Sequence, residues 1–286
     1  MTSSEYKKSQ LKQLGSIINM SPERLSWILD NLDSFYKERT EDKFDRKKND
    51  FKRYADGSIK KRTIRPSYKD LKLAQHRIKS RILKPIALPI NVQGGVKKKS
   101  NITNAKNHQG NKYVFVTDLQ DFFPSISSKM VYDALLNVGF TSFLASHICR
   151  FVTYKHSVPQ GAPTSTHISN IVFLKTDLKL IEFCNSKGIT YTRYVDDLTF
   201  SSQQNFHELT DDILAIVKDG GFLLSHRKTG YSGKRNHMIT GIEVQLNKID
   251  APAKTIERSL TEVDMPVKPV TIYLDSIRKT NKKIYR

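Results

Sequence analysis

The sequence is poor in cysteine and tryptophan and contains no long apolar run. Its two cysteines among 286 residues, Cys149 and Cys184, lie in apolar helical patterns, which favours two small core residues over a disulfide or a metal pair. No apolar run reaches the roughly 20 residues that a transmembrane helix needs. The first residues also form no apolar signal segment. Together these absences predict a cytoplasmic protein with no membrane partner.

Acidic residues are also scarce, and the basic excess is concentrated in one part of the chain. The sequence has 48 Lys and Arg against 28 Asp and Glu, a net charge of +20. The segment 41–112 alone holds 21 basic and 6 acidic residues. Such a segment, interleaved with aromatic residues, is typical of a surface that faces phosphates, so we expect nucleic acid as a partner and binding that weakens with salt. A solvated basic face is the alternative interpretation.

Two patterns of acidic residues indicate where chemistry could occur. The stretch 191–201 alternates aromatic and β-branched residues around Asp196 and Asp197, which predicts a β-hairpin with both carboxylates near its turn. A short apolar run ends at Asp118, 78 residues earlier, which predicts a buried strand closed by a carboxylate. If the fold brings them together, three carboxylates would hold two divalent ions about 4 Å apart. A surface turn and a helix cap are the ordinary roles of such residues.

Ordered motifs then make a family resemblance visible. The motifs are Phe115-Val-Thr-Asp-Leu-Gln-Asp-Phe-Phe-Pro-Ser125, Val158-Pro-Gln-Gly-Ala-Pro-Thr-Ser165 and Tyr194-Val-Asp-Asp197. In this order they resemble the palm motifs of bacterial reverse transcriptases. Asn104-Ala-Lys-Asn-His108 is similar to the NAxxH box of retron reverse transcriptases, and Ile239-Thr-Gly241 resembles their VTG box with Ile in place of Val. The resemblance covers Arg62 to Val244.

The resemblance implies an α+β fold of the right-hand polymerase type, with fingers, palm and a short thumb. Its expected parts are N-terminal helices and fingers at 1–117, palm at 118–245 with part of the fingers at about 125–157, and thumb at 246–286. The implied cofactors are two Mg²⁺ ions, with Mn²⁺ as a substitute. Asp118 and Asp196 would bridge both ions, and Asp197 would complete the site.

The resemblance also assigns expected roles to residues outside the aspartates. Expected nucleotide-binding residues are Lys61, Arg62, Arg65, Phe123, Gln160 and Lys228. Expected RNA-binding residues are Lys97, Lys98, Lys99, Asn104 and His108. The bulky ring of Phe123 would exclude a 2′-hydroxyl and so select deoxynucleotides. For most of these residues a structural or solvated role is the competing interpretation; for His108 that role would be a bond to a backbone carbonyl.

As a retron enzyme, the protein would copy part of a structured noncoding RNA into DNA joined to that RNA, using dNTPs. Its partners would be this RNA and its DNA product, an effector protein and a host RNase H, and its setting would be antiphage defence. Other bacterial reverse transcriptases, including intron-type relatives, and a catalytically silent RNA-binding relative remain alternatives. An RNA-directed RNA polymerase shares the palm, but Phe123 disfavours it.

Overall fold

The structure is a computed structural model that describes residues 3–45, 50–54, 56–262 and 265–281. The chain forms two compact units, each made of two separate stretches of sequence. The first unit contains residues 1–87 and 123–172, and the second contains residues 88–122 and 173–286.

The first unit is mostly helical. Its helical elements are α1 (Ser3–Ile18), α2 (Pro22–Asp30), η1 (Leu32–Phe35), α3 (Lys69–Ile78), the π-helical turn η2 (Lys79–Leu83), α6 (Ser128–Asn137) and α7 (Ser142–Val152). Ser21-Pro22 predicts the start of α2, and this is confirmed, because the Ser21 hydroxyl accepts a hydrogen bond from the Arg24 N–H at 3.2 Å and Pro22 is the first helical residue. Helix α3 packs against α1 and α7, and its buried Gln75 donates to the Phe151 carbonyl at 2.8 Å.

The Asp56-Gly57 pair predicts a β-hairpin over 51–66, and pairing around this turn is present: Arg53 and Ile59 form an antiparallel bridge, and the Lys60 N–H donates to the Lys52 carbonyl at 2.7 Å. Strand β4 (Lys61–Ile64) pairs antiparallel with β1 (Arg39–Asp42), and the short β2 (Phe44–Asp45) pairs with β3 (Asp50–Phe51). The highly charged run 41–49 predicts a loop, which is wrong for residues 41, 42, 44 and 45, while 46–49 lie outside the described residues. Opposite charges face each other across β1 and β4, a cross-strand contact that a search for apolar alternation cannot detect. The turn at Gly57, with φ +84°, is present.

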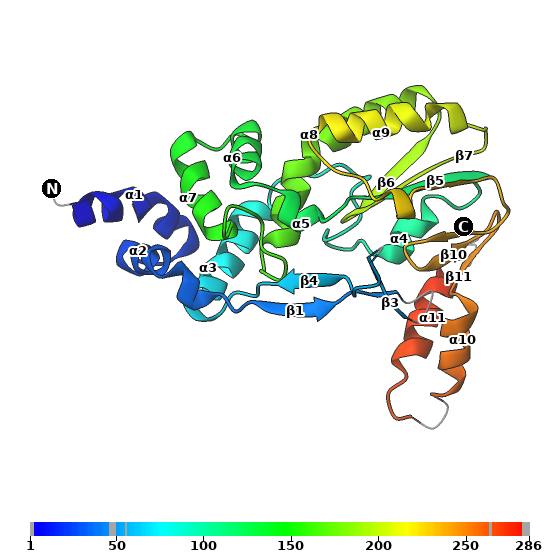
Figure 1. The fold of residues 1–286 in the computed structure, drawn as a ribbon, viewed down its shortest axis with the longest axis horizontal. Coiled ribbons are helices and arrows are strands. Elements are labelled where there is room, and N and C mark those ends of the chain that lie inside the picture. Colours follow the sequence, from blue (N-terminus) through cyan, green and yellow to red (C-terminus); the bar gives the residue numbers. More distant parts are fainter. Residues whose placement is uncertain (1–2, 46–49, 55, 263–264, 282–286) are drawn as a thin grey trace, which may run out of the picture. The chain divides into compact units, whose positions relative to one another are not determined.

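The second unit is built on a four-stranded antiparallel sheet with the strand order β6-β7-β5-β8. These strands are β5 (Tyr113–Asp118), β6 (Thr190–Tyr194), β7 (Asp197–Ser202) and β8 (Gly230–Ser232). Around them lie α4 (Asn101–Lys106), η3 (His207–Leu209), α9 (Thr210–Asp219) and η4 (His226–Lys228). Figure 1 shows α9 on one side of this sheet and α4 on the other. Two helices join the units in sequence: α5 (Phe122–Ser125) and α8 (Ser165–Ser186).

A smaller sheet and a helical pair complete the second unit. The sheet has the order β11-β10-β9, with β9 (His237–Ile239), β10 (Ile242–Val244) and β11 (Ile249–Asp250). The alternation over 238–244 predicts a single strand, but Thr240 and Gly241 adopt φ of 45° and 82° and turn the chain into a hairpin. Helices α10 (Ala253–Leu260) and α11 (Pro269–Lys279) follow, and α11 contributes Leu274 and Ile277 to the core beneath this sheet.

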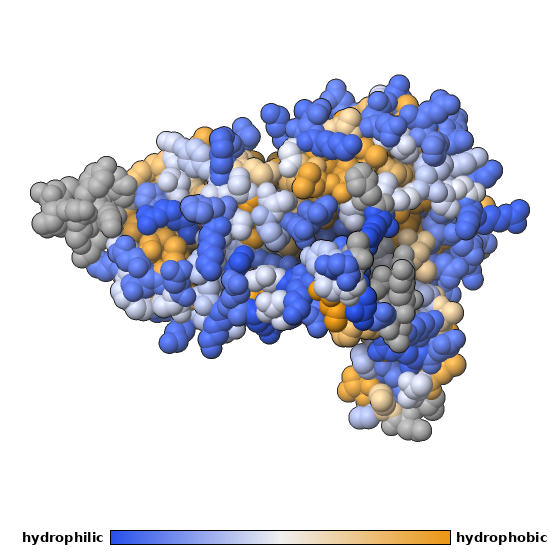
Figure 2. Space-filling model, viewed as in Figure 1, coloured by the Kyte–Doolittle hydropathy of each residue, from blue (hydrophilic) through white to orange (hydrophobic). Residues whose placement is uncertain are grey.

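The exposed surface, the burial of the cysteines and the character of the helices agree with the composition of the sequence. The region of α10 and α11 carries exposed apolar residues, among them Leu260 and Ile272, beside basic ones (Figure 2). Both cysteines are buried and free, as predicted. Among the described residues, no helix combines the length and the apolar character required to cross a bilayer.

Candidate active site

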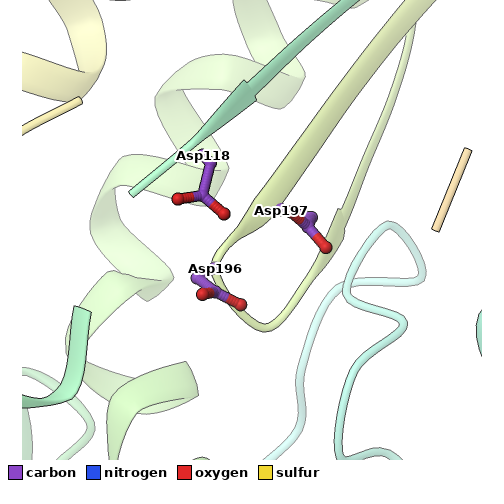
Figure 3. A group of neighbouring side chains, drawn as sticks. All are labelled: Asp118, Asp196 and Asp197. Atoms are coloured by element: carbon purple, nitrogen blue, oxygen red, sulfur yellow. The ribbon is translucent and has the colours of Figure 1, made fainter. Parts of the chain in front are cut away.

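The three predicted aspartates meet at one end of the four-stranded sheet. Strand β5 ends at Asp118, which lies directly opposite Asp197, the first residue of β7. Asp196 sits in the turn between β6 and β7, and its backbone carbonyl accepts a hydrogen bond from the Leu119 N–H at 2.9 Å. Figure 3 shows the carboxylates of the strand end and of the hairpin facing the same small space. One ligand oxygen from each carboxylate lies within 4.8 Å of the other two. The predicted convergence is confirmed.

The electrostatics of this cluster reflect burial and like charge. Burial, followed by repulsion from the Asp196 and Asp118 carboxylates, raises the pKa of Asp197 to about 7. Burial and then the Asp118 charge also raise the pKa of Asp196. Neighbouring carboxylates that resist ionisation are stabilised in their charged form by a bound cation. The cluster therefore gains from cation binding most strongly when all three groups are ionised.

The donor set fits a hard divalent cation. All the candidate ligand atoms are carboxylate oxygens, the donors that Mg²⁺ and Mn²⁺ prefer over sulfur or nitrogen. Mg²⁺ usually takes one or two protein carboxylates and completes its shell with water and substrate phosphates. The residues present thus fit a site for a hard divalent cation.

Lys228 joins the cluster from the end of η4. Its ammonium donates to Asp118 Oδ1, although the lysine side chain remains 45% exposed. Burial alone would lower the pKa of Lys228, but the hydrogen bond to Asp118 and the charges of the aspartates raise it overall. The lysine therefore carries its positive charge beside Asp118. Lys228 is thus not the fully solvated surface lysine of the alternative interpretation.

Three residues that the sequence did not single out hold the turn between β6 and β7 that carries Asp196. Arg193 on β6 is fully buried, forms an ion pair with the buried Asp177 on α8, and donates to the Val195 carbonyl. Gly94 packs against the turn, because a Cβ atom placed there would lie 2.4 Å from the Val195 nitrogen. The available signal was Arg193 itself, a charge within an otherwise apolar and hydroxyl-bearing strand.

The predicted fingers residues belong to the first unit. Arg62 and Arg65 donate to the carboxylates of Glu41 and Glu38, with N–O distances of 2.8 and 2.7 Å. Lys61 lies on β4 and is exposed. The basic character of this strand is thus partly offset by acids of β1 and the preceding segment. Nucleotide contact by these three residues stays a prediction.

Phe123 and Gln160 also belong to the first unit. Phe123 is half-buried, whereas the neighbouring Phe122 is a core residue and packs against the ring of Phe222. The Gln160 carbonyl accepts a hydrogen bond from the Arg65 N–H at 2.7 Å, which fixes this loop to the segment after β4. The nucleotide-binding roles of Phe123 and Gln160 stay predictions.

The two retron-type boxes contact each other inside the second unit. The Asn104 amide donates to the Thr240 hydroxyl at 3.3 Å. His108 lies between the Thr192 and Ser201 hydroxyls, 2.6 Å from each. Burial lowers the pKa of His108 to about 3, so its ring is neutral. Both box residues are fully buried, so their side chains support β6, β7 and the β9–β10 turn and are not accessible to RNA in this arrangement. His108 thus bonds hydroxyls and not the expected backbone carbonyl.

The lysine cluster 97–99 divides in two. Lys97 and Lys98 are exposed, as an RNA-contacting role requires. The Lys99 ammonium donates to the carbonyl oxygens of Ile90 and Val92, at 2.6 and 2.8 Å. Lys99 therefore closes its own loop, and RNA contact by this side chain would require it to leave both carbonyls.

An α+β chain whose antiparallel sheet presents three carboxylates at a strand end and a hairpin turn is of the right-hand polymerase class, where such a sheet forms the palm. Comparison with known sequences narrows the class. Residues 46–244 match the family model described as reverse transcriptase (RNA-dependent DNA polymerase). The chain belongs to the reverse transcriptase family.

The most similar curated relatives include retron enzymes, in agreement with the resemblance seen in the motifs. The chain is 31% identical to the Retron Ec86 reverse transcriptase of Escherichia coli over 191 residues, 66% of this chain and 60% of that protein. It is 32% identical to the Retron Mx162 reverse transcriptase of Myxococcus xanthus over 236 residues, 72% of this chain and 48% of that protein. The matches thus span about half to three-fifths of these relatives.

Among solved structures, apo telomerase from Candida tropicalis matches with a TM-score of 0.48 at 11% identity. The match covers 74% of this chain and 43% of the telomerase.

Proposed function

We propose that this protein is an RNA-directed DNA polymerase of retron type. The observation that carries the proposal is the meeting of Asp118, Asp196 and Asp197 at one end of the sheet, in a chain of the reverse transcriptase family. Nucleotidyl transfer needs oxygen ligands that hold divalent ions against phosphates, and this cluster supplies them. The net charge of +20 suits a nucleic-acid template and product.

The reaction joins the primer 3′-oxygen to the α-phosphorus of a dNTP, with breakage of the bond to pyrophosphate. Two bound Mg²⁺ ions, or Mn²⁺ in their place, would lower the pKa of the 3′-hydroxyl and stabilise the charge on the leaving oxygens. Asp118 and Asp196 would bind both ions and Asp197 would complete the site. Lys228, whose ammonium already lies beside Asp118, would neutralise the departing pyrophosphate or donate a proton to it. Phe123 would exclude a ribose 2′-hydroxyl.

The basic residues of the fingers would bind the incoming triphosphate. Arg62, Lys61 and Arg65 are proposed for this role, and Gln160 for contact with the nucleotide and the template. In the structure, Arg62 forms an ion pair with Glu41 of β1, and Arg65 forms an ion pair with Glu38. A triphosphate carries more charge than one carboxylate, so it would displace these partly exposed ion pairs at little cost.

Retron type is supported by the contact between the NAxxH and ITG boxes and by the curated relatives. The template would be part of a structured noncoding RNA, primed from a 2′-hydroxyl of that RNA, and the product would be DNA joined to it. Lys97 and Lys98 are proposed to contact this RNA, with Asn104 and His108 in supporting positions. A cytoplasmic location, an effector protein, a host RNase H that trims the template and a role in antiphage defence belong to the same proposal.

Primer extension tests the proposal. The purified protein, given an RNA template, a DNA primer, Mg²⁺ and dNTPs, should extend the primer, while Asp196→Ala/Asp197→Ala should not. RNA binding by gel shift should persist in that variant, because the substitution removes negative charge. Glu208→Ala, an exposed acid on η3, is the control for loss of acidic charge elsewhere in the second unit and should extend normally. Full activity of the double variant would refute the assignment.

The second candidate is another bacterial reverse transcriptase, defence-associated or intron-type, and the Ile in place of Val in the ITG box favours it. Sequencing the nucleic acid that copurifies with the protein distinguishes the two. A 2′,5′-branched RNA–DNA molecule supports the retron type, and unbranched DNA supports the other. A catalytically silent RNA-binding relative would bind RNA and extend no primer.

A further inference from the structure

Arg193 is the largest fully buried side chain in the described part of the chain. Its guanidinium forms a two-point ion pair with Asp177 of α8, through Nε at 3.0 Å and Nη2 at 2.6 Å. The Tyr191 hydroxyl donates to the same carboxylate at 2.7 Å, and the ring of Phe173 lies 4.7 Å beneath the guanidinium. The arginine is therefore held on three sides by α8 and by its own strand.

The remaining arm of this guanidinium reaches the catalytic turn. Arg193 Nη1 donates to the Val195 carbonyl at 3.0 Å. Val195 has φ +61°, a left-handed conformation that is a strained outlier for a β-branched residue. Such a conformation persists only where surrounding contacts hold it, and the next residue in the chain is Asp196.

A loop holds the turn from a second direction. The backbone N–H of Gln93 donates to the Arg193 carbonyl at 2.8 Å, which places Gly94 against the turn. A Cβ atom on Gly94 would lie 2.4 Å from the Val195 nitrogen, so only glycine permits this approach. The turn is thus fixed between the guanidinium and the backbone of this loop.

We propose that Arg193, oriented by Asp177 and Tyr191, is a positioning residue that holds the Val195 turn so that Asp196 and Asp197 face Asp118. A buried ion pair contributes little to stability compared with apolar residues of similar volume, so stability alone is a weak reason for this network. Its placement behind the metal-binding carboxylates gives it the role of an outer-shell support, whose loss typically weakens metal binding by about 10–100-fold. The role in catalysis rests on the proposed polymerase function, whereas the effect on metal binding does not.

The experiment separates positioning from stability. In Asp177→Leu/Tyr191→Phe/Arg193→Met the whole polar network becomes apolar, so that no buried charge is left without its partner. Mn²⁺ affinity is measured on the protein alone, from the electron paramagnetic resonance signal of free Mn²⁺, and thermal unfolding is followed in parallel. We expect folded protein whose Mn²⁺ affinity is reduced by about 10–100-fold. The Mg²⁺ concentration for half-maximal primer extension should rise by a similar factor, and KM for the template should stay unchanged.

Ser201→Ala is the matched control on the same hairpin. It removes hydrogen bonds to His108 and Asn111 at the end of β7 remote from Asp197, so it should lower the unfolding temperature and keep wild-type Mn²⁺ affinity. Wild-type Mn²⁺ affinity in the folded triple variant would overturn the proposal. An equal loss in Ser201→Ala would overturn it too, because any loosening of the hairpin would then suffice.

If the triple variant does not fold, Arg193→Lys decides. Lysine keeps the charge beside Asp177 but lacks the second arm that reaches the Val195 carbonyl, so Mn²⁺ affinity should still fall. Unchanged affinity would refute the positioning role. If the wild-type protein incorporates no dNTP, the proposed function fails, while the Mn²⁺ measurement still decides whether Arg193 positions the carboxylates.

Discussion

The burial of Asp197, together with repulsion from Asp196 and Asp118, predicts that stability depends on pH and on metal together. The perturbation is a change from pH 5 to pH 8, with EDTA or with saturating Mg²⁺. In the folded protein the pKa of Asp197 is raised to about 7, against 3.8 for an ordinary aspartate. The folded state therefore binds more protons than the unfolded state between these two values, and stability without metal falls as pH rises through this window.

The size of the effect follows from that shift. This increase in the pKa of Asp197 lowers the free energy of unfolding by on the order of a few kcal/mol once Asp197 is fully ionised, since one pKa unit is worth about 1.4 kcal/mol. Mg²⁺ at about 100 times its Kd would raise the free energy of unfolding by about 2.7 kcal/mol. For a protein of this size that is a rise in Tm of roughly 5–10 °C. At pH 5 Asp197 is protonated and Mg²⁺ should add much less.

The assay is thermal unfolding of the wild-type protein and of Asp197→Asn, at both pH values and with or without Mg²⁺. Asparagine cannot ionise, so without metal the variant should exceed the wild type in stability, and by a larger margin at pH 8 than at pH 5, because only part of the loss has occurred at pH 5. Comparing the two proteins at the same pH cancels the titration of groups that lie outside this carboxylate cluster. Equal stabilisation of the wild type by Mg²⁺ at pH 5 and pH 8 would refute the argument.

Three further predictions concern residues outside the carboxylates. Phe123→Ala should raise ribonucleotide incorporation by at least about tenfold in primer extension with rNTPs, and unchanged discrimination would contradict the proposed steric role. His108→Leu should lower the free energy of unfolding by about 2–4 kcal/mol in urea denaturation, because the buried Thr192 hydroxyl loses its partner and the Ser201 hydroxyl keeps only its bond from Asn111; an unaffected midpoint would show that the hydroxyls are satisfied otherwise. The Glu262 carboxylate accepts hydrogen bonds from the backbone N–H groups of Val270 and Thr271 at the start of α11. Glu262→Ala should therefore increase hydrogen exchange at these two amides, and unchanged exchange there would rule out this cap.

The site was predictable from the sequence because its determinants are local. A short apolar run marks β5, alternation marks the β6–β7 hairpin, and each pattern places its carboxylates at a strand end or turn without knowledge of the rest of the fold. The buried strand ending at Asp118 was predicted for the same reason. The motif order then supplied the family, which the sequence comparison confirmed.

The supporting network was not predictable, because its partners are set by tertiary structure. Nothing near Asp177 marks it as the partner of Arg193, since its helix shows no strong apolar face that would tell buried from exposed positions. The pairing of β1 with β4 was missed for a related reason: both strands are charged and mostly exposed. The turn at Thr240 was not predicted because the alternation of apolar and polar residues continues on both sides of it.

The measurement that tests the central claim most directly is anomalous diffraction from crystals of the protein grown with Mn²⁺ and a dNTP. The account predicts two peaks about 4 Å apart, in contact with Asp118, Asp196 and Asp197 and with the triphosphate. Triphosphate density with no Mn²⁺ at these carboxylates, or Mn²⁺ bound elsewhere in the molecule, would contradict it.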